Sequence, residues 1–198
     1  MPLIATAILG VLFNLWYVVE LSALFTLFVI YFFRDPPRQP VHQNPHIVLA
    51  PADGTIREIS TDKETKSTLL RTTMNLFNVH VTRAPISGLV TESGEQTGAH
   101  FPIFFQRAKM QNQRKHLIIK SLKLMVTLVF VAGFIARQIA LYVQPGDIVT
   151  QGQRLGIIKL GSEVDLILHH PSKLELLVKE GDKTQAGETV IGIFKDEG

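Results

Sequence analysis

A glycine and a serine near the C-terminus, Gly161 and Ser162, are the pair with the most suggestive chemistry in this chain. Glycine has no side chain to block attack on its own carbonyl, and it tolerates strained backbone geometry. The Ser162 hydroxyl could therefore add to the Gly161 carbonyl and convert the amide into an ester. Elimination and hydrolysis would then leave a pyruvoyl group, a ketone made from the chain itself, at a new N-terminus. Both residues also favour ordinary turns, so the pair alone leaves that alternative open.

A histidine and an aspartate could assist such a serine. His80 lies in a β-rich run, where strand alternation turns its side chain away from those of Val79 and Val81. Asp53 precedes Gly54 in a dipeptide that is common in turns. Serine, histidine and aspartate act together as nucleophile, base and orienting carboxylate in several folds, in any chain order. From the residue types alone, a surface histidine and a plain turn are the simpler interpretations.

The composition excludes some chemistry and some partners. The chain has 198 residues and no cysteine, which rules out disulfides and thiolate nucleophiles, and its histidines lack the company that would predict a metal site. A net charge of +3 and a mean hydropathy of +0.21 indicate an anionic partner and a membrane element. Nucleic acid is not an expected partner, because the basic residues are scattered and aromatic residues do not interleave with them.

Residues 1–33 are expected to anchor the chain to a membrane, because residues 3–33 are apolar except for Glu20. A single helix over residues 16–33 would be about 27 Å long, close to the ~30 Å of the hydrocarbon core. Two shorter helices, 3–19 and 21–33, would instead form a hairpin with Glu20 at its turn, where the carboxylate reaches water. A proline-rich linker over residues 34–46 follows.

The pattern beyond the linker predicts a mainly β catalytic domain over residues 47–198, a compact barrel or sandwich. Short β-rich runs are separated by turn residues. These runs cover residues 47–49, 55–59, 67–73, 79–82 and 89–91. The apolar stretch 117–143 is interrupted by Lys120, Lys123 and Arg137, so it predicts two or three buried strands, with a turn or short helix near Gly133.

Two pairs of stretches resemble each other. Residues 142–149 and 177–184 are 35 residues apart, and residues 50–56 resemble residues 84–90. Such paired hairpins are typical of the lipoyl and biotinyl carrier fold, whose carrier lysine usually lies between two methionines. No Met-Lys-Met occurs here. A non-catalytic, membrane-anchored adaptor or carrier module is therefore the alternative to an enzyme.

Six motifs in a fixed order carry a resemblance to a known family. They are Arg34-Asp35-Pro36, Pro51-Ala52-Asp53-Gly54, Asn78-Val79-His80-Val81-Thr82-Arg83-Ala84-Pro85, Gly133-Phe134-Ile135-Ala136-Arg137, Gly161-Ser162-Glu163-Val164-Asp165 and Val178-Lys179-Glu180-Gly181-Asp182. Together they cover nearly the whole chain and resemble the short, self-processing form of phosphatidylserine decarboxylase. The resemblance implies autocatalytic serinolysis between Gly161 and Ser162. The products would be a β chain of residues 1–161 and an α chain of residues 162–198 headed by a covalent pyruvoyl group.

The resemblance also implies roles for single residues. Ser162 would be the nucleophile and become the pyruvoyl group, His80 the base, and Asp53 the carboxylate that orients His80. The pyruvoyl ketone would take up the headgroup amine of phosphatidylserine and accept the electron pair left by carbon dioxide, yielding phosphatidylethanolamine. Arg83 and Arg137 are the candidate contacts for the substrate's phosphate or carboxylate, because guanidinium binds both bidentately.

The implied partners are phosphatidylserine in an anionic membrane and the α and β chains of one precursor. The basic flank formed by Arg34 and Arg38 favours the cytoplasmic face of the inner membrane. A homo-oligomer stays open. Members of this family often carry an acid near the position of Gln113, which cannot act as a base, so any role of that acid is in question here.

Overall fold

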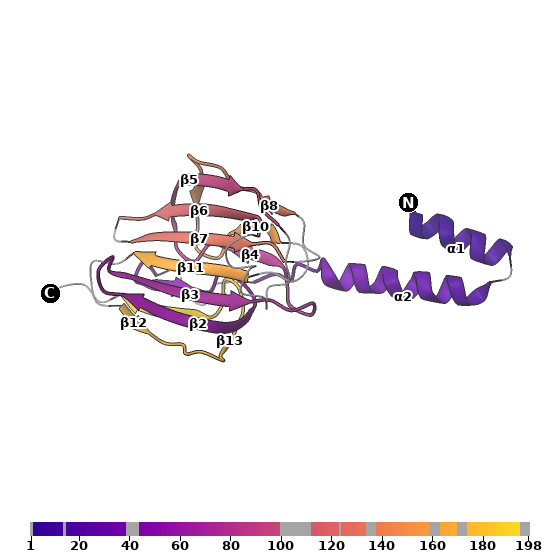
Figure 1. The fold of residues 1–198 in the computed structure, drawn as a ribbon, viewed down its shortest axis with the longest axis horizontal. Coiled ribbons are helices and arrows are strands. Elements are labelled where there is room, and N and C mark those ends of the chain that lie inside the picture. The colour runs from indigo at the N-terminus through magenta and orange to yellow at the C-terminus, as the bar shows by residue number, and fades with distance from the viewer. Residues whose placement is uncertain are drawn as a thin grey trace. The chain divides into compact units, whose positions relative to one another are not determined.

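The computed structural model describes residues 2–13, 15–38, 44–99, 112–122, 124–133, 138–158, 163–169 and 174–194. The chain divides into two units, Met1–Pro36 and Pro37–Gly198, each described by itself. The first unit consists of two helices that pack against each other, α1 (Pro2–Leu12) and α2 (Trp16–Phe32) (Figure 1).

The N-terminal helices keep part of each expected arrangement. Helix α2 covers nearly the residues of the expected single helix, 16–33, and α1 packs against it as in a hairpin, but α1 ends at Leu12 and α2 begins at Trp16. The predicted hairpin turn at Glu20 is wrong, because Glu20 lies inside α2, where its exposed side chain reaches water without a turn. Helix α2 has 17 residues, and no helix in the described part of the chain is both long and apolar enough to cross a membrane. The expected membrane-spanning helix is therefore not supported.

The second unit is mainly β, as predicted. Its described strands are β1 (Ile47–Leu49), β2 (Gly54–Asp62), β3 (Ser67–Thr73), β4 (Val81–Arg83), β5 (Gly88–Gln96), β6 (Arg114–Lys120), β7 (Met125–Val131), β8 (Ile139–Leu141), β9 (Ile148–Val149), β10 (Arg154–Ile158), β11 (Glu163–His169), β12 (Leu174–Leu176), β13 (Lys183–Thr184) and β14 (Val190–Phe194). The apolar stretch 117–143 supplies parts of β6, β7 and β8, which confirms buried strands there. The turn or short helix expected near Gly133 falls largely on residues 134–137, outside the described residues.

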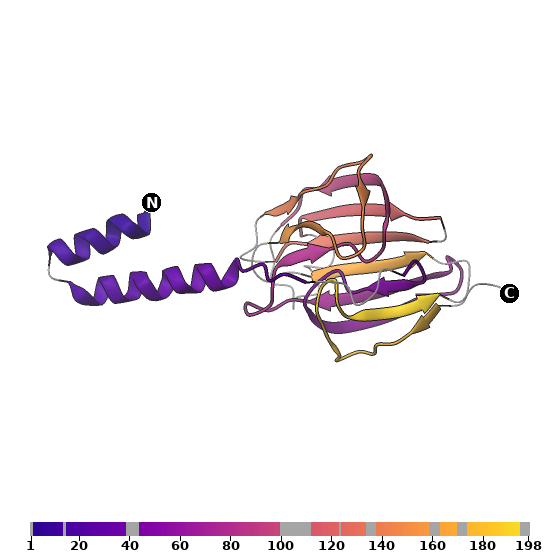
Figure 2. The same ribbon diagram turned by 180° about the vertical axis from the view of Figure 1, so that it is seen from behind.

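Three antiparallel sheets build this unit. The largest has eight strands in the order β13-β2-β3-β11-β7-β6-β5-β9 and curls into a half-barrel. Two three-stranded sheets, β1-β14-β12 and β4-β10-β8, lie behind it in the view of Figure 1 and in front in Figure 2. The core between the sheets is apolar. Its most central side chains include Val48, Leu117, Val126, Leu128, Phe130, Leu155, Val164 and Leu166, all almost fully buried.

The strand order reveals an internal approximate twofold symmetry. In the large sheet, β13, β2, β3 and β11 repeat in reverse order as β9, β5, β6 and β7. The ladders also share an irregularity, because the pairing shifts register between Ile56 and Glu58 in β2 and between Val90 and Glu92 in β5. The small sheets correspond in the same way, β1-β14-β12 to β4-β10-β8. The symmetry axis passes between the central strands β11 and β7.

The weak sequence repeat is the trace of this symmetry. Four glycines with φ angles from 76° to 99°, a region that favours glycine, close equivalent turns in the two halves. Their matching backbone hydrogen bonds, each 2.8 Å long, run from Gly146 to Val90, from Gly181 to Ile56, from Gly152 to Ala84 and from Gly187 to Ala50. The repeated hairpins are therefore a property of the architecture, independent of any carrier lysine.

Candidate active site

The ladder of the large sheet places the residues that follow Asp53 and Ser162 in the sequence at one end of that sheet. Thr55 in β2 pairs with Thr73 in β3, and Thr73 pairs with Glu163 in β11. Asp53 lies two residues before Thr55, and Ser162 directly precedes Glu163 in the sequence. Gly161 and Ser162 themselves lie outside the described residues.

Asp53 is a buried carboxylate with a full set of donors. Arg38 donates to both of its oxygens, from Nη1 at 2.5 Å and from Nη2 at 2.8 Å. The backbone N–H of Ala186 donates to Oδ1 at 2.8 Å, and that of Val79 approaches Oδ2 at 3.4 Å. The carboxylate is therefore fixed by one charged side chain and by two backbone groups from different loops.

Arg38 is predicted from the sequence to be part of a basic flank, but its side chain is only 7% exposed and binds Asp53. Besides Asp53, it donates to the Ala186 carbonyl at 3.0 Å and lies 3.8 Å from Glu188. The partners Arg38 and Asp53 are 15 residues apart, with Arg38 inside the proline-rich linker, and no local pattern marks such a tertiary pair.

His80 is almost fully buried, and the orientation of its ring follows from one contact. Nδ1 lies 2.9 Å from the Asn78 carbonyl, which only accepts, so Nδ1 carries the proton. In the neutral ring Nε2 then holds the lone pair that a general base needs. Among the described contacts, Asp53 reaches His80 through the backbone of Val79 and not through the ring.

The backbone ties His80 to the strand that leads to the serine. Ile158, the last residue of β10, donates its N–H to the His80 carbonyl at 3.1 Å. Ser162 follows four residues later. The His80 backbone is thereby fixed to a residue that lies four positions before Ser162 in the sequence.

The strand that begins after Ser162 is held by a charged cluster. Arg71 in β3 donates from Nε and Nη2 to the two oxygens of Asp165, at 2.8 and 2.9 Å, and also binds Glu58. Its Nε lies 3.8 Å from Glu163, whose Oε1 also accepts from Thr73. The hydrogen bond with Asp165 raises the pKa of Arg71 above its usual value, so this guanidinium stays charged.

Of the two candidate substrate-binding arginines, only Arg83 is among the described residues. Arg83 is buried, and its Nη1 donates to the Gly152 carbonyl at 3.1 Å. Its side chain lies so close to Gly187 that a Cβ there would be 2.8 Å from Arg83 Cδ. Arg137 lies outside the described residues. Gln113, the departure from the family pattern, donates to Glu95 Oε1 at 2.6 Å.

The internal symmetry supplies a counterpart of the Asp53 site that lacks the carboxylate. Ser87 takes the place of Asp53, and its Oγ accepts the N–H of Gln151 at 2.9 Å, just as Asp53 accepts that of Ala186. His46 corresponds to His80, because its carbonyl accepts the N–H of Phe194 at the end of the equivalent strand.

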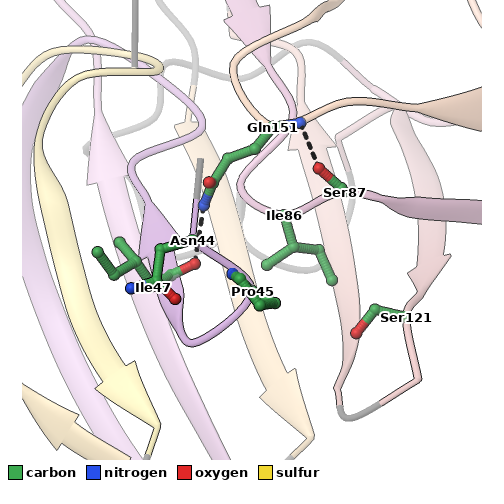
Figure 3. A pocket seen from close by; sticks show the side chains of 7 residues that line it. All are labelled: Asn44, Pro45, Ile47, Ile86, Ser87, Ser121 and Gln151. Atoms are coloured by element: carbon green, nitrogen blue, oxygen red, sulfur yellow. Dashed lines mark hydrogen bonds between the residues drawn. The ribbon is translucent and has the colours of Figure 1, made fainter. Parts of the chain in front are cut away.

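The counterpart contains a pocket of about 240 Å³. Figure 3 shows the Gln151 backbone N–H directed at Ser87 and the Gln151 amide directed at Ile47. The pocket is lined by Asn44, Pro45, Ile47, Ile86, Ser87, Ser121 and Gln151. One scaffold is thus used twice, and only the copy with Asp53 has a carboxylate held by an arginine.

Comparison with known proteins agrees with the chemistry of this site. The family model described as phosphatidylserine decarboxylase matches residues 25–192. A phosphatidylserine decarboxylase proenzyme of Chlorobium chlorochromatii is 38% identical over 90% of this chain and 84% of its own length. Those of Prosthecochloris aestuarii and Carboxydothermus hydrogenoformans are 41% and 36% identical, over 88% and 95% of this chain and 81% and 89% of their own. The chain therefore belongs to the phosphatidylserine decarboxylase family.

Proposed function

We propose that this enzyme decarboxylates phosphatidylserine with a pyruvoyl group that it makes from its own Ser162. Membership of the family supports the decarboxylation itself. The observation that carries the finer proposal is the meeting of Asp53, His80 and the start of β11 at one end of the large sheet. The non-catalytic adaptor alternative is wrong, because the family is one of enzymes. The repeated architecture that suggested it is nevertheless present.

In the first stage, His80 acts as the base. Its Nε2 takes the proton of the Ser162 hydroxyl, and the oxygen attacks the Gly161 carbonyl, so that the amide becomes an ester. β-Elimination then releases the Gly161 carboxylate and leaves dehydroalanine at position 162, which water hydrolyses to the pyruvoyl group with loss of ammonia. The Asn78 carbonyl stabilises the positively charged ring that forms, because it accepts a hydrogen bond from Nδ1–H. Asp53 is a positioning residue, since Arg38 fixes it and it holds the N–H of Val79 beside His80.

In the second stage, the pyruvoyl group would supply the electron sink for the pair left by carbon dioxide. His80 then delivers the proton to the substrate carbon. Arg83 and Arg137 are the candidate contacts for the phosphate or carboxylate of the headgroup. His80 and Arg83 belong to one motif, Asn78-Val79-His80-Val81-Thr82-Arg83-Ala84-Pro85, and Arg137 belongs to another, Gly133-Phe134-Ile135-Ala136-Arg137.

The fold fits a chain that is cut before β11. This strand is paired along its whole length with β3 on one side and β7 on the other. The later strands β13 and β14 pair with β2 and β1. The α chain therefore stays bound to the β chain by four ladders after the covalent link is gone.

The enzyme works at a membrane, because its substrate is a bilayer lipid. The apolar helices of the first unit are the proposed attachment, and large side chains such as Leu12, Leu21 and Leu24 are exposed on them. We assign the catalytic unit to the cytoplasmic face from the basic flank at Arg34, since the side chain of Arg38 is buried against Asp53. A homo-oligomer is compatible with this arrangement.

Intact mass measurement under denaturing conditions tests the self-cleavage. The wild-type chain should give a fragment of 37 residues, 162–198, with a blocked N-terminus. Ser162→Ala should remain one chain of 22.1 kDa and release no carbon dioxide from phosphatidylserine. Ser87→Ala, at the counterpart pocket, should be cut normally. An active Ser162→Ala enzyme would refute the role of the serine, and a free serine at the fragment's N-terminus would indicate simple proteolysis.

A further inference from the structure

A turn just ahead of His80 presents two large apolar side chains to the surface. Leu76 is 40% exposed and Phe77 69% exposed, which makes Phe77 the most exposed aromatic ring among the described residues of the second unit. On either side of them the chain returns to the core, because Met74 and Val79 are almost fully buried. The two apolar side chains therefore form a short projecting tip.

Hydrogen bonds within the turn hold the tip in its projecting form. The N–H of Asn75 donates to Asn78 Oδ1, and the N–H of Phe77 donates to Asn75 Oδ1, each at 2.8 Å. The N–H of Asn78 also donates to the Asn75 carbonyl at 3.2 Å. Two asparagine side chains thus satisfy the backbone of the turn locally.

The tip and the candidate base share residues. The Asn78 carbonyl accepts a hydrogen bond from Nδ1–H of His80. The N–H of Val79, the next residue, approaches Asp53. The turn that carries Leu76 and Phe77 therefore leads directly into the groups that contact His80 and Asp53.

The two copies of the sequence repeat differ here. Asn78 and His80 correspond to Asn44 and His46, 34 residues earlier, and at the same offset from positions 76 and 77 the sequence has a histidine and a glutamine, which lie outside the described residues. The apolar pair thus occurs only in the copy that contains Asp53. Exposed apolar side chains cost free energy in water and regain it where they enter lipid.

We propose that Leu76 and Phe77 insert into the surface of the bilayer and hold the reactive site at the level of the lipid headgroups. The occupant is the bilayer itself, because the substrate's reacting group lies in its headgroup layer. This inference rests on phosphatidylserine as substrate and does not depend on the pyruvoyl chemistry.

Tryptophan fluorescence tests the contact directly. The only native tryptophan, Trp16, is replaced in the full chain by Trp16→Phe, and a reporter is added by Phe77→Trp. The control adds Ile148→Trp, at a position 79% exposed at the opposite, counterpart end of the sheet. Vesicles of phosphatidylglycerol and phosphatidylcholine with brominated acyl chains should shift the Phe77→Trp emission to the blue and quench it, and leave the Ile148→Trp emission unchanged. Equal quenching of both reporters, or of the control alone, would overturn the proposal.

Activity provides the second measurement. In the double variant Leu76→Ser, Phe77→Ser, turnover of phosphatidylserine in vesicles should fall about tenfold relative to turnover of a water-soluble, short-chain phosphatidylserine. An equal loss on both substrates would overturn the proposal, because the side chains would then serve the reaction and not the bilayer. The quenching experiment needs no turnover, so it remains decisive even where the pyruvoyl mechanism fails.

Discussion

Asp53 depends on Arg38 more than on any other described side chain. Both groups are buried, and Arg38 supplies two of the four donors to the carboxylate. The arginine also spans two loops, because it binds the Ala186 carbonyl as well. In the proposed mechanism, this pair holds the N–H of Val79 beside His80.

Arg38→Gln should slow self-cleavage strongly. Leaving a buried carboxylate without its cation costs about 3–5 kcal/mol, and each ~1.4 kcal/mol lost from transition-state positioning is about a factor of ten in rate. A time course of the cut fraction by intact mass, after synthesis in a cell-free system, measures the effect. The self-cleavage rate of Arg38→Lys should lie between those of Arg38→Gln and the wild type, because lysine keeps the charge without the bidentate geometry.

Arg57→Gln is the matched control, since Arg57 is exposed at the bulge of β2. It should be cut at the wild-type rate. Normal cutting of Arg38→Gln would show that Asp53 does not need its arginine.

Glu95 offers a titration that reports on Gln113. The hydrogen bond from Gln113, and next that from Lys115, lower the pKa of Glu95 below its usual value. A lowered carboxyl pKa contributes stability above the usual value of 4.5, and that contribution is lost as the pH falls through the lowered pKa. Gln113→Ala should move the pKa of Glu95 back up, as measured by carboxyl NMR. An unchanged pKa would mean that the Gln113 contact is not formed in solution.

At the scale of the element, β11 is the strand on which the site depends. It lies at the centre of the large sheet, and Arg71 from β3 binds its Asp165 and approaches its Glu163. The equivalent positions of the other half lack this charged cluster, because β6 and β7 carry isoleucine and threonine where β3 and β11 carry Arg71 and Asp165.

Arg71→Met should destabilise the uncut precursor by about 3–5 kcal/mol. The reason is that the carboxylates of Asp165 and Glu58 would lose the cation that binds them both. The measurement is urea unfolding in a Ser162→Ala background, so that cutting does not interfere. Lys115→Met, which removes the ion pair with Glu95 at the sheet surface, should cost less than about 1 kcal/mol. Equal losses in the two variants would contradict a special role for Arg71.

Much of the element pattern was predictable because it is local. Alternation and turn residues predicted the strand Ser67–Thr73 with its observed bounds, and the glycine turns predicted the repeat. The turn at Glu20 was wrong because a charge was taken to need a turn, whereas an exposed face of α2 is enough. The pairing of Arg38 with Asp53 was missed because it is a tertiary contact between irregular segments.

At the scale of the whole molecule, the two symmetric halves are not consecutive in the chain. One half, β4–β10, is continuous over residues 81–158. The other consists of β1–β3 and β11–β14, so residues 163–194 must return to complete what residues 47–73 begin.

The α and β chains should therefore separate only on unfolding. Native size-exclusion chromatography of the cut enzyme should give one peak that contains both chains, and denaturant should release the 37-residue fragment. The physical reason is that β11, β13 and β14 each pair with β-chain strands. Release of the fragment in native buffer would contradict this arrangement.

The interrupted half also gives the proposed reaction a form of quality control. A nascent chain in which residues 163–194 have not yet paired lacks the strands that complete this half, so on this scheme it does not cut itself. Self-cleavage would then occur only after folding is complete. A stalled or truncated chain would form no pyruvoyl group and would expose no reactive ketone.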